Sequence, residues 1–326
     1  MTRPDIMPLR LFGRYGVVVA LILLIAFGAW RYDNFLGQFN ILSFLRYNSM
    51  FALVALGMAF VIMTGGIDLS VGAVAALGSV VAALASPYGL VPGLIAGMAA
   101  GLAAGLVNGF VITRLGIVPF IATLATMLAA GGAALLLAKN QSVSVSYESG
   151  FTELGQGNLL GFPIPAWMAL GCYGLGSVVL NFTSFGRTVL AIGGNEDATR
   201  LMGLPAERVK FLTYVASGAL SGLAGVVLAA QFGAGQPIEG VGWELFAIAA
   251  VVVGGTPLTG GNGSVETTLA GVLLLGLIFN ILNFENGRGF ISLSAYWQSV
   301  IRGLFLLVVV VLQAKLVGRT ASASAS

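Results

Sequence analysis

The feature that most constrains this chain is a succession of apolar stretches, each about 20 residues long, separated by short polar turns. Of the 326 residues, 58% are hydrophobic and 8% are charged, and the mean hydropathy is +0.98. Water-soluble domains carry roughly 25% charged residues. A soluble fold could not bury this much apolar surface, so the composition predicts an all-α polytopic membrane protein, a bundle of transmembrane helices.

Ten stretches are long enough, or nearly so, to cross a bilayer as helices. We expect them to form a single transmembrane domain over residues 1–326, with glycine-rich broken or re-entrant segments and a disordered tail at 315–326. The eighth stretch is short. The predicted spans are 13–30, 47–64, 67–86, 90–113, 117–137, 164–183, 211–232, 243–256, 264–283 and 296–314.

The distribution of lysine and arginine predicts the orientation of the chain. With the N-terminus inside, ten of the 15 cations fall in cytoplasmic segments, four fall in outer segments, and Arg302 lies within the last span. This bias satisfies the positive-inside rule and places both termini in the cytoplasm. The cations before the first span imitate a signal peptide, but more spans follow at once, which favours an uncleaved first helix.

Several classes of function are excluded by residues that the chain lacks. It has no histidine and one cysteine, Cys172, so we expect no disulfide framework, no metal site, no cofactor and no histidine base catalysis. The cations are dispersed rather than clustered, which argues against nucleic acid as a partner. No Gly-x4-Gly-Lys-Ser/Thr sequence occurs, so any ATP must be handled by another polypeptide.

One polar, glycine-rich break interrupts the apolar pattern at 64–72 and carries a carboxylate, Asp68, with no local cation. A charge at membrane depth costs roughly 3 kcal/mol or more and is by default a candidate functional residue. The alternative is that Asp68 caps the helix that follows, and both interpretations can hold. If Asp68 shapes a pathway, its replacement should severely reduce transport while leaving the protein inserted.

A second glycine-rich break at 254–264 aligns with the first at an offset of 189 residues, with Pro257 opposite Asp68. Paired interruptions of this kind point to the site of a transporter. We also expect Glu244 to lie near Arg302 in the outer half of the membrane, either paired with it or apart from it. The candidate residues of a transport pathway are Thr64, Gly65, Gly66, Asp68, Ser70, Asn108, Glu244 and Thr256.

Two long loops are predicted, one on each side of the membrane. The outer loop, 140–163, suits either a periplasmic contact or a solvated cap. The inner loop, 184–210, holds a short amphipathic helix with Asn195 as its N-cap and a glycine stop at Gly203. This helix is either a solvated connection or a docking surface for a cytoplasmic partner, and its candidate residues are Gly194, Asn195, Glu196, Arg200, Leu201 and Gly203.

Five groups of residues form a recognisable set of motifs: 65–72, 105–109 with 119–124, 191–195 with 201–203, 242–256, and the region of Trp297 and Arg302. Together they resemble one family, the permeases of bacterial ABC sugar importers of the ribose, xylose and galactofuranose type, over roughly 275 residues. In one departure, Gly131-Gly132 stands where the family commonly has Arg-Gly, and Asn283-Phe284 looks closer to the galactofuranose type.

The resemblance implies a multi-pass protein of the bacterial inner membrane that acts with a cytoplasmic ATP-binding subunit, a periplasmic sugar-binding protein and a second permease copy or paralogue. Three functions remain open at this point: an importer subunit for a monosaccharide or for another small polar solute, a self-contained channel or secondary transporter, and a membrane enzyme. An ATP-driven importer subunit is favoured over a self-contained channel or secondary transporter, because ion coupling would favour several carboxylates at membrane depth and only Asp68 is clearly there. A membrane enzyme lacks any nucleophile and base that could be paired.

Overall fold

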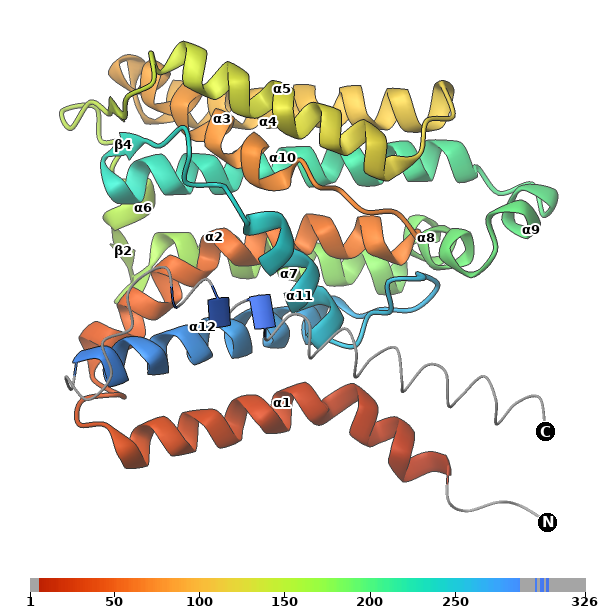
Figure 1. Cartoon of the computed structure of the whole chain (residues 1–326), viewed down its shortest axis with the longest axis horizontal. Helices are drawn as coiled ribbons and strands as arrows, with labels where there is room; N and C mark the ends of the chain where they lie inside the picture. The colour runs from red at the N-terminus through yellow and green to blue at the C-terminus, as the bar shows by residue number, and fades with distance from the viewer. Residues whose placement is uncertain (1–5, 288–296, 298–299, 302, 305–326) are drawn as a thin grey trace.

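The computed structural model describes residues 6–287 together with positions 297, 300, 301, 303 and 304. In this part of the chain, twelve α-helices run mostly side by side, and four two-residue strands and one 3-10 turn join them (Figure 1). The helices are α1 (Ile6–Arg31), α2 (Gln38–Met63), α3 (Val71–Ala85), α4 (Leu90–Arg114), α5 (Pro119–Leu137), α6 (Glu153–Gln156), α7 (Ile164–Phe182), α8 (Ser184–Gly194), α9 (Glu196–Leu201), α10 (Ala206–Phe232), α11 (Trp243–Val253) and α12 (Val265–Gly287); the turn is η1 (Ser86–Tyr88).

The all-α class is confirmed, but the count of ten helices is not. Among the described residues, seven helices are long and apolar enough to cross a membrane, and the apolar part of α1 and α11 are shorter. The predicted inner loop is also wrong in its first half, because residues 184–194 form the helix α8. The last predicted span, 296–314, lies almost entirely outside the described residues, as do Arg302 and the tail.

Helices α2 and α10 form the centre of the bundle. Every residue of α2 from Asn48 to Met63 is buried. Helix α10 packs against α2, α3 and α4, and in Figure 1 it lies between the layer of α3, α4 and α5 and the layer of α2 and α7. Helices that are apolar on all sides belong inside a bundle, which explains why these two carry almost no charge along their buried length.

Glycines let α4 and α10 approach closely. Five buried glycines recur at every fourth residue of α4, at 93, 97, 101, 105 and 109. A Cβ atom at Gly101 would overlap the carbonyl oxygen of Gly218 in α10, and a Cβ at Gly218 would overlap the carbonyl oxygen of Gly101. Small residues at this spacing form the close helix contacts of membrane proteins, so this pair explains part of the chain's high glycine content.

Two helices, α3 and α11, begin inside the bundle rather than at its ends. At 1.5 Å per residue, α11 is about 16 Å long, shorter than the roughly 30 Å of a bilayer's apolar core, whereas α3 is about 22 Å long and reaches the length of a membrane span only together with η1. Figure 1 shows both starting near the middle of the bundle. Gly72, in the first turn of α3, packs so tightly on Gly240, just before α11, that neither position has room for a Cβ.

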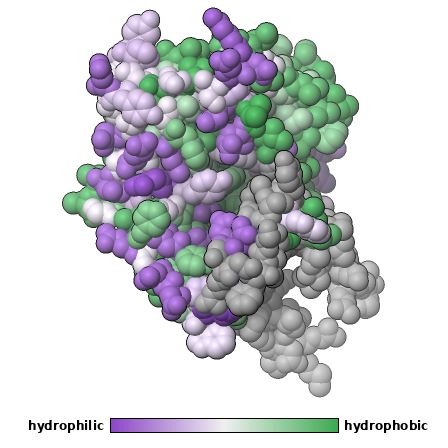
Figure 2. All heavy atoms as spheres, turned by 60° about the vertical axis from the view of Figure 1, so that its left-hand side comes forward, coloured by the Kyte–Doolittle hydropathy of each residue, from purple (hydrophilic) through white to green (hydrophobic). Residues whose placement is uncertain are grey.

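The two ends of the bundle differ. One end, called the strand end here, carries α6 and two antiparallel strand pairs, β1 (Val143–Ser144) with β4 (Ala234–Gly235) and β2 (Asn158–Leu159) with β3 (Phe162–Pro163). Figure 2 brings this end forward and shows many hydrophilic residues on it. The opposite end carries α9, a six-residue helix beyond the ends of the long helices (Figure 1), and is called the α9 end.

Candidate functional site

The first glycine-rich break ends α2 with a tight left-handed turn. Gly65 has a φ of +79°, a conformation that glycine adopts without strain. The Thr64 hydroxyl donates to the carbonyl oxygen of Val61 at 2.7 Å, and the amide of Gly66 donates to the same oxygen at 3.1 Å. The carbonyl groups at the end of α2 are therefore satisfied locally, and the chain turns back into the bundle towards α3.

Asp68 lies in this returning segment and is fully buried, with 1% of its surface exposed. Its Oδ1 accepts hydrogen bonds from the amide and the hydroxyl of Ser70, at 3.0 and 2.6 Å, and its Oδ2 accepts one from the hydroxyl of Ser217 in α10, at 2.8 Å. Asp68 is not the N-cap of α3, because Ser70 occupies that position and no side chain caps the helix. The interpretation of Asp68 as the helix cap is therefore wrong.

The Asp68 network continues from Ser70 into two further helices. Asn108 of α4 donates from Nδ2 to the Ser70 hydroxyl at 2.9 Å, and Thr126 of α5 donates to Asn108 Oδ1 at 2.6 Å. Neutral hydroxyl, amide and backbone groups thus surround the carboxylate, and no ion pair involves it in the described part of the chain. The sequence predicted Ser70 and Asn108 but missed Ser217 and Thr126, whose only signal is a hydroxyl within an apolar helix.

The two glycine-rich breaks meet at the α9 end of the bundle. The amide of Gly261 donates to the carbonyl oxygen of Met63 at 3.0 Å, and Gly260 packs against the backbone of Gly65. Gly193, in the last turn of α8, packs against both Met63 and Gly261 without room for a Cβ. This contact of three backbone segments, called the glycine junction here, connects both breaks to the helix that precedes α9.

The backbone conformations of the two breaks match at an offset one residue larger than the sequence alignment predicted. Gly255, rather than Gly254, has the left-handed φ of +90° that matches Gly65. The Gly65 amide donates to the oxygen three residues earlier at 2.8 Å, and the Gly255 amide does the same at 2.9 Å. The offset is therefore 190 residues, and Leu258 rather than Pro257 stands opposite Asp68.

The remaining pathway candidates lie in two places. Thr256 is buried in the second break, and a Cβ at Gly263 would meet both its hydroxyl oxygen and the side chain of Met63. Glu244 lies in the first turn of α11, half-buried, and one of its carboxylate oxygens would be 3.0 Å from a Cβ at Gly72. Glu244 is thus near the start of α3, while its expected partner Arg302 lies outside the described residues.

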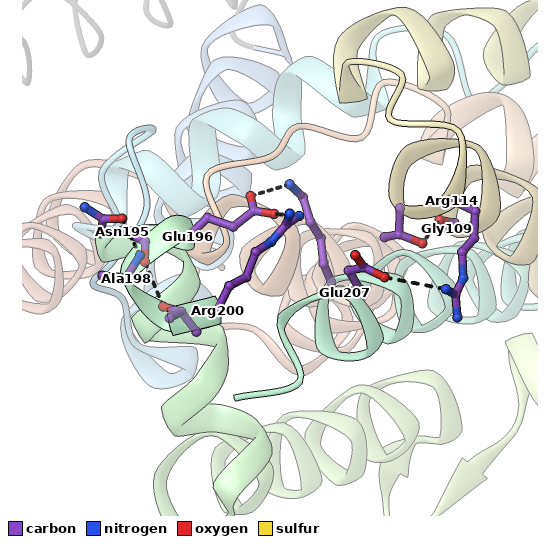
Figure 3. Close-up of polar contacts among 10 residues, drawn as sticks. Gly109, Arg114, Asn195, Glu196, Ala198, Arg200 and Glu207 are labelled. Atoms are coloured by element: carbon purple, nitrogen blue, oxygen red, sulfur yellow. Dashed lines mark hydrogen bonds and ion pairs between the residues drawn. The ribbon is translucent and has the colours of Figure 1, made fainter. Parts of the chain in front are cut away.

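Helix α9 forms as predicted. Asn195 Oδ1 accepts a hydrogen bond from the Ala198 amide at 2.9 Å, and the chain turns at Gly203, whose φ is +75°. Glu196 forms ion pairs with Arg200 and with Lys210 of α10, each at 2.8 Å (Figure 3). Burial raises the pKa of Glu196, but the hydrogen bonds and charges of the two cations outweigh burial and hold this pKa below its ordinary value.

The outer surface of α9 combines apolar side chains with charge. Leu201 and Met202 are 89% and 67% exposed. Glu196 and Arg200 of the same helix line a polar cavity of about 530 Å³ between α9, the start of α10 and the turn from α4 to α5. An ion pair of 3.5 Å between Arg114 and Glu207 crosses this cavity's edge (Figure 3). Together, Gly194, Asn195 and the residues of α9 present an exposed apolar pair next to a charged recess.

Comparisons with known proteins agree over almost the whole chain. Residues 40–310 match the family described as "Branched-chain amino acid transport system / permease component". The chain is 41% identical over 305 residues to the ribose import permease protein RbsC of Bacillus subtilis, covering 93% of each chain. It is 40% identical to the L-arabinose transport system permease protein AraH of Escherichia coli, covering 93% of this chain and 90% of that one. No solved structure matches the chain.

Proposed function

Because this chain belongs to the family of branched-chain amino acid transport system permease components, we propose that it is the membrane-spanning subunit of an ATP-driven importer that carries a monosaccharide. The family is one of transport subunits, which agrees with the expectation that the chain is not an enzyme. The sugar is supported by the relatives, whose names state ribose import and L-arabinose transport. The resemblance to sugar-importer permeases is confirmed by the same relatives.

The α9 end is assigned to the cytoplasm and the strand end to the periplasm. The bias of lysine and arginine supports this orientation, since the inner loop around α9 is the most charged stretch of the chain. Both termini then lie in the cytoplasm of a cell whose inner membrane holds the protein. The partners we propose are a cytoplasmic ATP-binding subunit, a periplasmic sugar-binding protein, a second permease copy and the surrounding lipid.

The observation that carries the proposal is the exposed surface of α9. On this cytoplasmic helix, Leu201 and Met202 are mostly exposed to solvent and have charged neighbours. Such a surface suits a partner with an apolar recess and complementary charge. An ATP-binding subunit is the partner that the family implies. The contacts of α8 with both breaks supply a short route from that partner to Asp68 and Thr256.

Co-purification tests this surface. We expect Leu201→Ser with Met202→Ser to release the ATP-binding subunit from the detergent-solubilised complex, because the apolar anchor is lost. The matched control is Leu160→Ser, which changes an equally exposed leucine at the strand end. Equal retention of the ATP-binding subunit by the α9 variant and by the control would contradict the docking surface.

The competing function is a self-contained channel or secondary transporter. The single buried carboxylate of the described bundle, Asp68, is bound by neutral donors and gives little support for ion coupling. Purified permease alone, reconstituted in vesicles, distinguishes the two functions. Sugar flux at the full rate without the ATP-binding subunit would favour the channel or secondary transporter.

A further inference from the structure

A cavity of about 620 Å³ opens between α2, α12, α11 and the end of α10 in the strand-end half of the bundle. None of the candidate pathway or docking residues predicted from the sequence lines it. We infer that this cavity holds one monosaccharide, with aromatic rings against its C–H faces and side-chain amides and Arg46 at its hydroxyl groups. The inference rests on the proposed function, since it names where that substrate is held. The volume of the cavity lies within the range of small-molecule sites, roughly 300–1,000 Å³.

The wall of the cavity is aromatic. Phe51 of α2 lies 4.5 Å from Phe246 of α11 and 5.4 Å from Tyr47, measured between ring centroids, and Phe246 lies 6.2 Å from Phe279 of α12. Small-molecule sites combine such apolar and aromatic walls with a few polar groups that orient the ligand. A sugar ring, apolar on its C–H faces and polar at its edge, has the matching distribution.

Two polar atoms at the cavity have no hydrogen-bond partner within the described part of the chain. They are Nε of Arg46, a donor, and the amide oxygen of Gln231, an acceptor, and both are buried. A buried polar atom without a partner is costly, and an unexplained one indicates a missing water, ion or ligand. A hydroxyl group accepts one hydrogen bond and donates another, so sugar hydroxyls suit both atoms after a small rotation of either side chain.

The charge of the lining favours a neutral ligand over an amino acid. The described lining residues include Arg46 but no aspartate or glutamate, so an ammonium group would find no opposite charge there. The Nη2 atom of Arg46 already donates to the carbonyl oxygen of Gln156 and to Oδ1 of Asn158, each at 3.1 Å. These contacts fix the guanidinium at the cavity's edge and leave Nε for the ligand.

A second cavity adjoins the first. This second cavity, of about 450 Å³, shares Tyr47, Phe51, Phe246 and Phe279 with the first and extends along α11 to Trp243. Trp243 begins α11, beside the contact between Gly72 and Gly240. A sugar released from the first cavity would thus move along an aromatic wall towards the level of Glu244 and Asp68.

Protection of a single cysteine tests the site without ATP or a partner. In full-length protein in lipid nanodiscs, Cys172→Ala removes the native thiol, and Ser43→Cys places a near-isosteric thiol in the cavity wall. D-ribose or L-arabinose at about ten times its dissociation constant leaves roughly one cavity in ten empty, so we expect either sugar to slow thiol labelling of Ser43→Cys about tenfold. Labelling of the control, Ser142→Cys on the exposed strand-end surface, should not change.

A second variant tests the hydrogen bond itself. Gln231→Ala should raise the half-protecting sugar concentration about tenfold, whereas Gln141→Ala, which changes an exposed glutamine outside the cavity, should leave it unchanged. Failure of both sugars to protect Ser43→Cys, or protection by L-leucine alone, would overturn the inference. If vesicles still import sugar while Ser43→Cys is unprotected, the proposed function stands and only the location of the sugar is wrong.

Discussion

Asp68 shows how a single carboxylate is kept in an apolar bundle without a cation. Its two oxygens accept three hydrogen bonds from Ser70 and Ser217, and the network reaches α4 and α5 through Asn108 and Thr126. Because buried charge is tolerated only when it is well hydrogen-bonded, these hydroxyls are as necessary as the carboxylate. The residue therefore joins four helices, whatever its part in the pathway.

Substitution of Asp68 separates its charge from its hydrogen bonds. Asp68→Asn can still accept from Ser70 and can donate to Ser217, so we expect it to keep most of the thermal stability. Asp68→Leu leaves the amide of Ser70 and the hydroxyl of Ser217 unpaired, at a cost of about 1–3 kcal/mol for each buried group. Thermal unfolding in detergent measures the difference. A leucine variant as stable as the wild type would contradict the structural part of this account.

The contact between Gly66 and Tyr214 allows a second test. A Cβ at Gly66 would overlap the Tyr214 hydroxyl, while its next neighbours lie at 3.3 and 3.4 Å. That hydroxyl is buried and has no hydrogen-bond partner among the described residues. We expect Gly66→Ala to lower the melting temperature, Tyr214→Phe to leave it nearly unchanged, and the double variant to recover most of the loss. Additive effects of the two substitutions would show that the hydroxyl is not the obstacle.

At the residue scale, the sequence predicts the polar positions but not their partners. Asp68, Ser70 and Asn108 stand out because they interrupt apolar stretches. Ser217 and Thr126 carry the same network, yet isolated hydroxyls in membrane helices are too common to single out. The cavity residues Arg46 and Gln231 come from separate helices with no shared motif, so only the fold brings them together.

At the scale of elements, the close packing of α4 against α10 depends on their glycines. Gly101→Ala would push a methyl group into the backbone of Gly218, and overpacking of this kind costs about 1–3 kcal/mol. We expect it to lower the melting temperature measured in detergent. The matched control is Gly132→Ala in α5, where a Cβ meets open space, and it should be neutral or slightly stabilising. Equal effects at both glycines would refute the close contact.

The ion pairs of α9 predict how this helix responds to acid. The pKa of Glu196 is lowered in the folded chain, so its stabilising effect is present above the ordinary glutamate pKa and is lost as pH falls through the lowered value. Hydrogen exchange of the α9 amides, corrected for intrinsic rates, should therefore be slow above the ordinary glutamate pKa and should speed up as the pH falls from there through the lowered value. Lys210→Met should move the loss to higher pH, and Lys139→Met, at the strand end, should not. Identical pH profiles for the two variants would contradict the assignment.

The sequence predicts the helices well where an apolar stretch is long. The described helices coincide with most predicted spans, and the Asn195 cap of α9 is confirmed. Helix α8 was missed because its glycines, serine and arginine resemble a loop. The depth at which α3 and α11 begin could not be predicted either, because apolar composition does not report position along the membrane normal.

At the scale of the whole molecule, the glycine junction connects the proposed docking surface to the breaks. Helix α8 leads directly into α9, and Gly193 contacts Met63 and Gly261 with no side chain between their backbones. A displacement of α9 by a partner must therefore move the junction or break its packing. This contact gives the proposed ATP-binding subunit a direct route to both glycine-rich breaks.

ATP-dependent uptake of sugar is the direct test of the proposed transport function. Vesicles containing this permease, its ATP-binding subunit and the periplasmic sugar-binding protein should accumulate labelled D-ribose or L-arabinose only when ATP is present on the α9 side. Leu201→Ser with Met202→Ser should abolish uptake, and Leu160→Ser should preserve it. Uptake at the same rate without ATP or without the ATP-binding subunit would contradict the claim that this chain is the permease of an ATP-driven sugar importer.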